Sequence, residues 1–108
     1  MAPDHQTQYR AAFSIPPDHP ALSGHFPGNP VVPGVVILDE IRLAAGHWLG
    51  DDLLVRRLPH AKFLSPLRPG EDATIELRRE GSSVAFRVAR GDATIARGAL
   101  ELESVNAP

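Results

Sequence analysis

A histidine and an aspartate fourteen positions apart, His25 and Asp39, are the residues of this chain best suited to acid–base chemistry. Between Gly24 and Asp39 the chain has three prolines, which fix φ, and three glycines, which free it. Such a path is stiff but irregular, and it can aim one side chain, here His25. An imidazole with an ordinary pKa of about 6.5 can take a proton near neutral pH, and a carboxyl can give one. The pair therefore predicts a site that moves protons.

A helix predicted from Val35 to Leu49 carries the aspartate, after Pro33 and Gly34. Few of its residues are polar, which predicts a helix buried on most sides. On a helix, Asp39 shares a stripe with Val35 and Gly46, and such apolar or small surroundings favour a protonated carboxyl that can act as a donor. Arg42, three positions later, supplies the alternative, an ion pair that keeps the carboxylate charged. The neighbouring Glu40 points about 100° away and cannot replace Asp39.

Short segments with period-two alternation surround this helix and predict strands. Tyr9 to Ile15 is the first, and four more follow the stop at Gly50-Asp51-Asp52. Two are predicted over 54–64 and 73–79, the third around Val84, Phe86 and Val88, and the last near the C-terminus, with hairpin turns at 80–82 and 90–92. In the last strand the apolar side switches after Ile95, which predicts a bulge near Arg97-Gly98. The sequence thus predicts an α+β fold.

The bulk properties favour one soluble domain over residues 1–108. A formal charge of −2 and a pI near 6.2 argue against a nucleic-acid-binding protein. No apolar stretch reaches membrane-spanning length, and the first residues lack the features of a signal peptide, so we expect a cytoplasmic protein with no membrane contact. A domain this small buries a limited core, which favours self-association.

Two further clusters invite interpretation. His25, His47 and His60 match no zinc-binding spacing, so we predict no metal, and His47 and His60 are expected to be exposed or packing residues. Trp48, at the end of the apolar helix, is expected in the core or an interface. Four positively charged residues follow the helix: Arg56, Arg57, Lys62 and Arg68. They either attract an acidic partner or form a solvated strand face.

The run His25-Phe26-Pro27-Gly28-Asn29-Pro30-Val31-Val32-Pro33-Gly34, followed by Asp39, closely resembles the signature of the 3-hydroxyacyl-acyl carrier protein dehydratases of fatty acid synthesis. A weaker similarity continues from Lys62-Phe63-Leu64-Ser65-Pro66 to the last strand. The resemblance implies a hot dog fold, in which an antiparallel sheet wraps round one long central helix. It also implies a dimer in which each active site draws on both subunits.

The resemblance further implies the reaction, dehydration of a 3-hydroxyacyl thioester to a trans-2-enoyl thioester. His25 would be the base and Asp39 the acid, a position where relatives have glutamate or aspartate. The backbone amides of Gly34 and Val35 would stabilise the thioester oxygen. No cofactor is implied, because the substrate is carried on the phosphopantetheine of acyl carrier protein, and Arg56, Arg57, Lys62 and Arg68 become candidates for binding that carrier.

Two departures from the family pattern matter. Leu43 occupies the position of a glutamine that helps orient the site in relatives, which predicts a missing hydrogen bond. The chain is also short, and in this it looks more like the small dehydratases of specialised lipid or aryl polyene pathways, some of which pair with a related, less active subunit. Two alternatives therefore stay open: a noncatalytic partner subunit of a heteromeric dehydratase, and a hot dog acyl thioesterase, which would not need His25.

Overall fold

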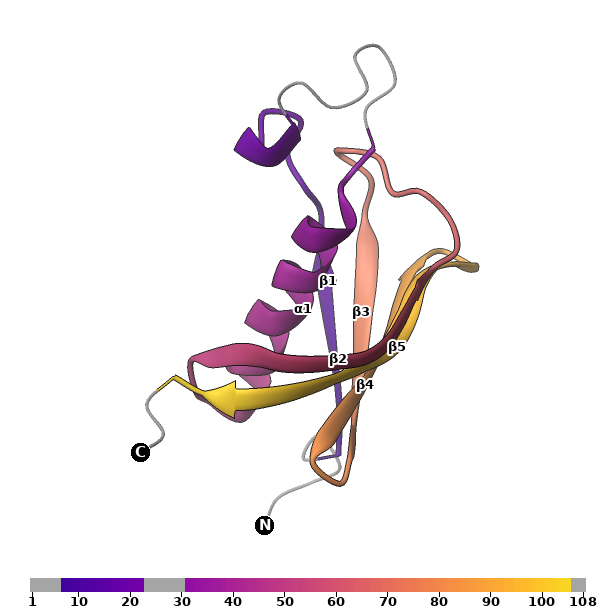
Figure 1. Ribbon diagram of the computed structural model, residues 1–108. Helices are drawn as coiled ribbons and strands as arrows, with labels where there is room; N and C mark the ends of the chain where they lie inside the picture. Colours follow the sequence, from indigo (N-terminus) through magenta and orange to yellow (C-terminus); the bar gives the residue numbers. More distant parts are fainter. Residues whose placement is uncertain (1–6, 23–30, 106–108) are drawn as a thin grey trace.

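The computed structural model describes residues 7–22 and 31–105. In these ranges one helix, α1 (Gly34–Leu49), lies against one face of a five-stranded sheet (Figure 1). The strands are β1 (Gln8–Phe13), β2 (Leu53–Phe63), β3 (Ala73–Glu80), β4 (Ser83–Arg90) and β5 (Ala93–Ser104), and a short 3-10 turn, η2 (Pro20–Leu22), precedes the helix. The predicted α+β architecture is confirmed, with helix and strand ends within about two residues of their expected places.

Every strand pairing is antiparallel, in the order β1-β3-β4-β5-β2. The predicted tight turns are present, because Gly81 and Gly91 adopt positive φ values of 63° and 57° between paired strands. At the end of α1, Gly50 has a left-handed conformation, and its N–H donates to the carbonyl of Gly46 at 2.8 Å. The predicted helix stop is therefore also confirmed.

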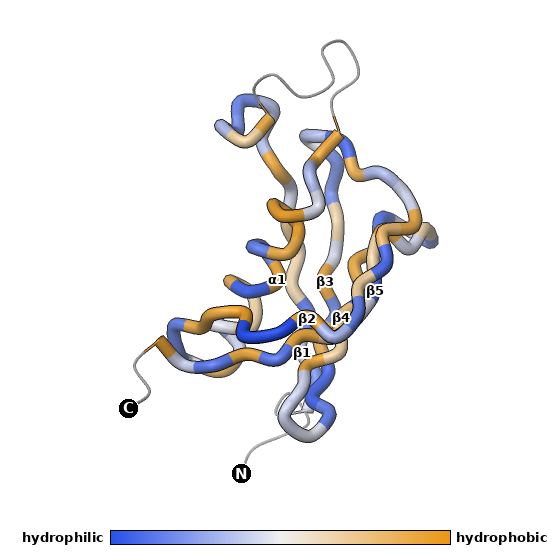
Figure 2. Tube along the Cα trace, in the orientation of Figure 1, coloured by the Kyte–Doolittle hydropathy of each residue, from blue (hydrophilic) through white to orange (hydrophobic). Residues whose placement is uncertain are grey.

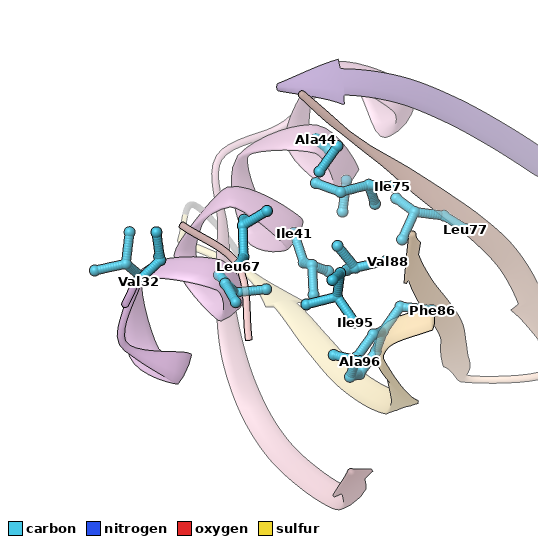
Figure 3. Close-up of a cluster of buried hydrophobic side chains, with 14 of the residues drawn as sticks. Val32, Ile41, Ala44, Leu67, Ile75, Leu77, Phe86, Val88, Ile95 and Ala96 are labelled. Atoms are coloured by element: carbon cyan, nitrogen blue, oxygen red, sulfur yellow. The ribbon is translucent and has the colours of Figure 1, made fainter. Parts of the chain in front are cut away.

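The core lies between α1 and the inner face of the sheet (Figure 3). The helix contributes its buried stripe, which consists of Val36, Ile37, Ile41, Ala44 and Ala45. The sheet meets it with alternate residues of three strands: Ile75, Leu77, Val84, Phe86, Val88, Ile95, Ala96 and Leu100. Because Ala44 and Ala45 are small, the helix can approach the strands closely. At the far end of the helix, Trp48 stacks on Tyr9 with ring centroids 5.9 Å apart, in keeping with the packing role expected for it.

The bulge in β5 lies two residues earlier than predicted. Ala96 pairs with Val88, but Thr94 pairs with Ala89, so Ile95 is the extra residue. Ile95 and Ala96 are both fully buried. The prediction of a bulge near Arg97-Gly98 is wrong in position because the strand shifts register where two consecutive residues must both face the core, rather than where the apolar side becomes polar.

The helix is not buried on most sides, contrary to the prediction. One stripe faces away from the sheet and is exposed; it consists of Val35, Asp39, Leu43 and His47, four residues apart. The exposed fractions of Val35 and Leu43 are 72% and 42%. The apolar composition reflects two different faces, one against the sheet and one uncovered in the single chain. With 16 residues, α1 is too short to span a bilayer, and no helix in ranges 7–22 and 31–105 has both the length and the hydropathy to do so.

Strand β2 forms one edge of the sheet, and nine of its eleven residues are exposed. Its first part is apolar and its middle strongly hydrophilic (Figure 2). The register against β5 is irregular between Val55 and Arg57 and again between Arg57 and His60, a stretch that includes Pro59. Proline has no N–H to donate, and an edge strand with bulges is where a sheet tolerates it.

Glu40 is the one acidic residue of α1 that is partly buried. Burial raises the pKa of its carboxyl above the ordinary value of 4.5, the neighbouring Asp39 carboxylate raises it further, and His19, in the turn before η2, acts in the opposite direction. His19 itself is oriented by accepting the N–H of Ala21 at Nδ1, at 3.1 Å. The helix therefore holds a carboxyl that keeps its proton to a higher pH than an ordinary glutamate does.

We expect Glu40→Gln to become more stable relative to the parent protein as the pH rises from about 4 to about 7. The folded protein holds the Glu40 proton more tightly than the unfolded chain, so this carboxyl stabilises the fold below pH 4.5, and the contribution is lost as the pH rises through the folded pKa. Urea unfolding at several pH values measures the difference. Glu103→Gln, at an exposed carboxylate, is the matched control and should show no such trend; a constant difference for Glu40→Gln would contradict the prediction.

Candidate functional site

Of the two residues predicted to move protons, the structure places one. His25 lies outside the described residues, so its role as a base stays a prediction. Asp39 lies just over one turn into α1, on the exposed stripe between Val35 and Leu43. The stripe that the sequence predicted for Val35 and Asp39 is present, but it faces outward. Within one chain, nothing covers the carboxylate, and its side chain is 54% exposed.

The Asp39 carboxylate is held by Arg42. Both Nε and Nη2 of Arg42 donate to Oδ1 of Asp39, at 2.9 Å and 2.7 Å. The third donor, Nη1, reaches the backbone carbonyl of Leu53 at 3.2 Å, at the start of β2. The guanidinium therefore links the helix to the edge strand and fixes one carboxylate oxygen. The ion pair that the sequence offered as an alternative is present, and the donor role of Asp39 stays a prediction.

Arg42 also bears on the interpretation of Leu43. The leucine at the expected glutamine position predicted the loss of a hydrogen bond that helps orient the site, and this stays a prediction. Asp39 receives two hydrogen bonds from Arg42, the residue before Leu43. The contact between Asp39 and Arg42 could be predicted from the sequence, since residues three apart on a helix are neighbours. The bond from Arg42 to the carbonyl of Leu53, eleven residues away, could not.

The start of α1 presents the two amides predicted to bind an oxyanion. In the part of the chain that the structure describes, the first recorded N–H bonds of the helix come from Val36 and Ile37, both to the carbonyl of Pro33, and none is recorded from Gly34 or Val35. Pro33 precedes the helix without a side-chain cap. The first amides of a helix carry partial positive charge and can stabilise a developing negative oxygen.

A hollow of about 310 Å³ lies beside these amides. Its walls are mainly apolar, and they include Val31, Ile37, Phe63 and Leu64. The ring of Phe63 lies so close to Gly34 that a Cβ at that position would come within 2.9 Å of it. Glycine at 34 therefore lets the aromatic ring close over the start of the helix. A second hollow, of about 360 Å³, lies at the other end of the boundary between α1 and β2 and includes Arg42 in its wall.

The four cations proposed from the sequence differ in their partners. Arg57 lies 3.8 Å from the carboxylate of Glu101, and Arg68 is linked to Glu71 through its own backbone N–H. Arg56 is exposed in the bulged part of β2. Lys62 differs, because on the outer face of the sheet it lies directly opposite Arg97 of β5.

Ranges 7–22 and 31–105 contain no group of three or more histidine, cysteine, aspartate or glutamate side chains placed to hold a metal ion. His47 and His60 are exposed, as predicted. The absence of a metal and of a cofactor from the reaction stays a prediction, because His25 lies in a segment that is not described.

Comparisons with known proteins agree with this geometry. A family model described as ApeI-like, the ApeI dehydratase, matches residues 2–99. The 3-hydroxyacyl-[acyl-carrier-protein] dehydratase FabZ of Thermus thermophilus is 32% identical over 103 residues, which cover 88% of this chain and 68% of the relative. FabZ of Chlamydia trachomatis serovar D is 32% identical over 97 residues, or 77% of this chain. The chain spans only 63% of that relative.

Solved structures show the same fold. The dehydratase heterocomplex ApeI:P from Xenorhabdus doucetiae superimposes with a TM-score of 0.80 at 24% identity, covering 94% of this chain and 91% of that one. The fluoroacetyl-CoA thioesterase FlK has a TM-score of 0.69 at 16% identity, covering 91% and 84%. The expected hot dog fold is thus confirmed, and dehydratases and thioesterases share it. By the family model and by its identity to the FabZ enzymes, the chain belongs to the ApeI-like dehydratase family.

Proposed function

We propose that this chain catalyses the dehydration of 3-hydroxyacyl-acyl carrier protein thioesters to trans-2-enoyl thioesters, as a single domain over residues 1–108. The observation that carries the proposal is the position of Asp39 on the exposed stripe of α1, one helical turn beyond the amide of Val35. Family membership and the names of the FabZ relatives support the same reaction.

In the proposed mechanism each proton transfer has its own residue. His25 removes the proton from C2 of the substrate, beside the thioester carbonyl, and the electrons move onto the carbonyl oxygen. The amides of Gly34 and Val35 stabilise that oxygen while it is negative. Asp39 delivers a proton to the hydroxyl on C3, the C3–O bond breaks, and water leaves as the C2–C3 double bond forms. The apolar hollow beside Gly34 accommodates part of the acyl chain or the thioester arm.

A second subunit completes the site in this proposal, either an identical copy or a related chain. We refer to the exposed stripe of α1 and the edge strand β2 together as the uncovered surface; its exposed large apolar residues are Val35, Leu43, Leu54, Val55, Leu58 and Phe63. Soluble monomers rarely leave so many apolar side chains together in water. A partner on this surface would cover Asp39 as well, and it would give the carboxylate the dry surroundings that the single chain lacks. The ApeI:P relative is itself a heterocomplex.

The test is the reversible dehydration of short and medium 3-hydroxyacyl thioesters on acyl carrier protein by the purified protein, with thiol release followed in parallel. We expect His25→Ala and Asp39→Asn each to lower kcat by about 10² to 10⁴, because each removes one proton-transfer group. Circular dichroism of both variants controls for folding. Thiol release without dehydration would replace the proposal with a thioesterase, and a folded protein inert in both assays would replace it with a noncatalytic partner subunit.

Arg42→Met should lower kcat by about 10-fold to 100-fold with little change in KM, because the carboxylate of Asp39 loses the groups that orient it. Stability should change by about 1 kcal/mol or less, since both side chains of the pair are partly exposed. Arg42→Lys should recover part of the rate, as an ammonium can reach Asp39 but cannot hold both oxygen partners. Arg79→Met, at an exposed arginine of β3, is the control. An unchanged kcat in Arg42→Met would show that the ion pair is only a surface contact.

Leu43→Glu and Leu58→Glu should each shift the protein from dimer to monomer at low micromolar concentration. Each places a charge on the uncovered surface, where a partner would have to desolvate it. Sedimentation velocity measures the change, and Ala12→Glu, exposed on the opposite edge strand β1, should leave the assembly intact. A parent protein that sediments as a monomer at all concentrations would contradict the proposed homodimer, and mixing with a related chain then tests the heterodimer.

A further inference from the structure

Five charged residues form one line across the outer face of the sheet, one from each strand. Strand pairing places Arg10 opposite Glu76, Glu76 opposite Arg87, Arg87 opposite Arg97, and Arg97 opposite Lys62. We refer to these five residues as the outer row. Because side chains alternate along each strand, all five point away from α1. Their formal charges sum to +3.

The carboxylate in the outer row is already shared. Glu76 lies 3.3 Å from Arg10 through one oxygen and 3.3 Å from Arg87 through the other. Arg87 also donates from Nε to Thr94 Oγ1 at 3.1 Å. For Arg97 and Lys62, no ion pair or hydrogen bond is recorded in ranges 7–22 and 31–105. Like charges directly opposite one another on neighbouring strands repel, so Arg87, Arg97 and Lys62 form a cationic end of the row, in which Arg87 alone shares the Glu76 carboxylate.

Two hollows follow this line and meet at Arg87. One, of about 660 Å³, has Arg10, Glu76 and Ala85 in its wall, and the other, of about 500 Å³, has Arg97, Lys62 and Gly98. Small residues lie beside the row where β4 and β5 cross it, since Ala85 pairs with Ala99. Cations border both hollows, and the large apolar residues in their walls, Tyr9, Leu77 and Phe86, are buried or partly buried against the core. A membrane-binding surface usually adds exposed apolar groups, so the exposed cations of the row favour an acidic protein surface as the occupant.

We propose that the outer row, at its cationic end of Arg87, Arg97 and Lys62, is the surface on which the acidic acyl carrier protein docks. This inference rests on the proposed dehydratase function. The positive charge of these three residues complements an acidic partner, and the position of Lys62 connects this surface to the proposed active site. Lys62 immediately precedes Phe63, whose ring lies over Gly34 at the start of α1. A carrier seated at this end of the row holds its thioester arm at the strand edge nearest the amides of Gly34 and Val35. The outer row thus replaces Arg56, Arg57 and Arg68 as the carrier contact.

The test compares two substrates in one variant. In Lys62→Gln/Arg97→Gln we expect KM for the carrier-bound 3-hydroxyacyl thioester to rise at least about 10-fold, with the loss shrinking at high salt as the charges are screened. Both kcat and KM for the same acyl group on N-acetylcysteamine, which has no carrier protein, should stay unchanged. Arg79→Gln removes an exposed arginine of β3 away from this row and should behave as the parent on both substrates.

Direct binding separates this inference from the reaction itself. Fluorescence anisotropy of labelled holo carrier protein should show weaker binding to Lys62→Gln/Arg97→Gln even if the parent dehydrates neither substrate, in which case only the proposed function has failed. Equal carrier affinity in the parent and this variant would overturn the inference. Binding of vesicles that contain about 30% phosphatidylserine, an anionic content on the order of that of a cell membrane, is the second test. If the variant loses vesicle binding but keeps its carrier affinity, the row is a membrane surface and the inference is overturned.

Discussion

The burial of one stripe of α1 against the inner face of the sheet determines where every functional group of this chain can lie. Ile37, Ile41 and Ala45 are at most 2% exposed, and Ile41 lies beside Val88 and Ile95 of the sheet (Figure 3). Once that side of the helix is fixed, the residues a half-turn away must face outward, and Asp39 is among them. The same contact fixes which residues of each strand face inward, so that charged residues are left on the outer face.

The exposed side of α1 and the edge strand β2 are both left uncovered in the single chain. Asp39 is oriented by Arg42 but uncovered, and the apolar groups around it lie in water. A proton donor works best where water is excluded, because electrostatic interactions are stronger there. The single chain thus orients Asp39 without removing it from water, and in our proposal the second subunit would supply that desolvation.

Much of the fold could be predicted from the sequence because its signals are local. The helix from Gly34 to Leu49 and the turns at Gly81 and Gly91 follow from hydrophobic period and turn chemistry. The bulge at Ile95 was misplaced because it depends on the register between two strands. The exposure of Val35 and Leu43 could not be predicted, because an apolar residue in the sequence is compatible both with a helix face buried in the core and with one left uncovered.

Part of the candidate site could likewise be predicted from the sequence, and part could not. The spacing of Asp39 from Arg42 made their ion pair predictable, whereas the anchor at Leu53 required the packing of helix and strand. The outer row was invisible in the sequence, since Arg10, Glu76 and Lys62 become neighbours of the other two only through strands that are far apart along the chain. The prediction from local charge density selected Arg56, Arg57, Lys62 and Arg68, of which only Lys62 lies in the row.

Pro59, in the exposed edge strand β2, limits how this sheet can grow. An edge with a continuous ladder of free N–H and C=O groups can template the addition of further chains and lead to fibrils. Here the ladder is interrupted in its middle by a residue without an N–H and by two register shifts. The opposite edge, β1, has only six residues. The protein can therefore leave a large apolar edge open for one specific partner while its own backbone discourages open-ended aggregation.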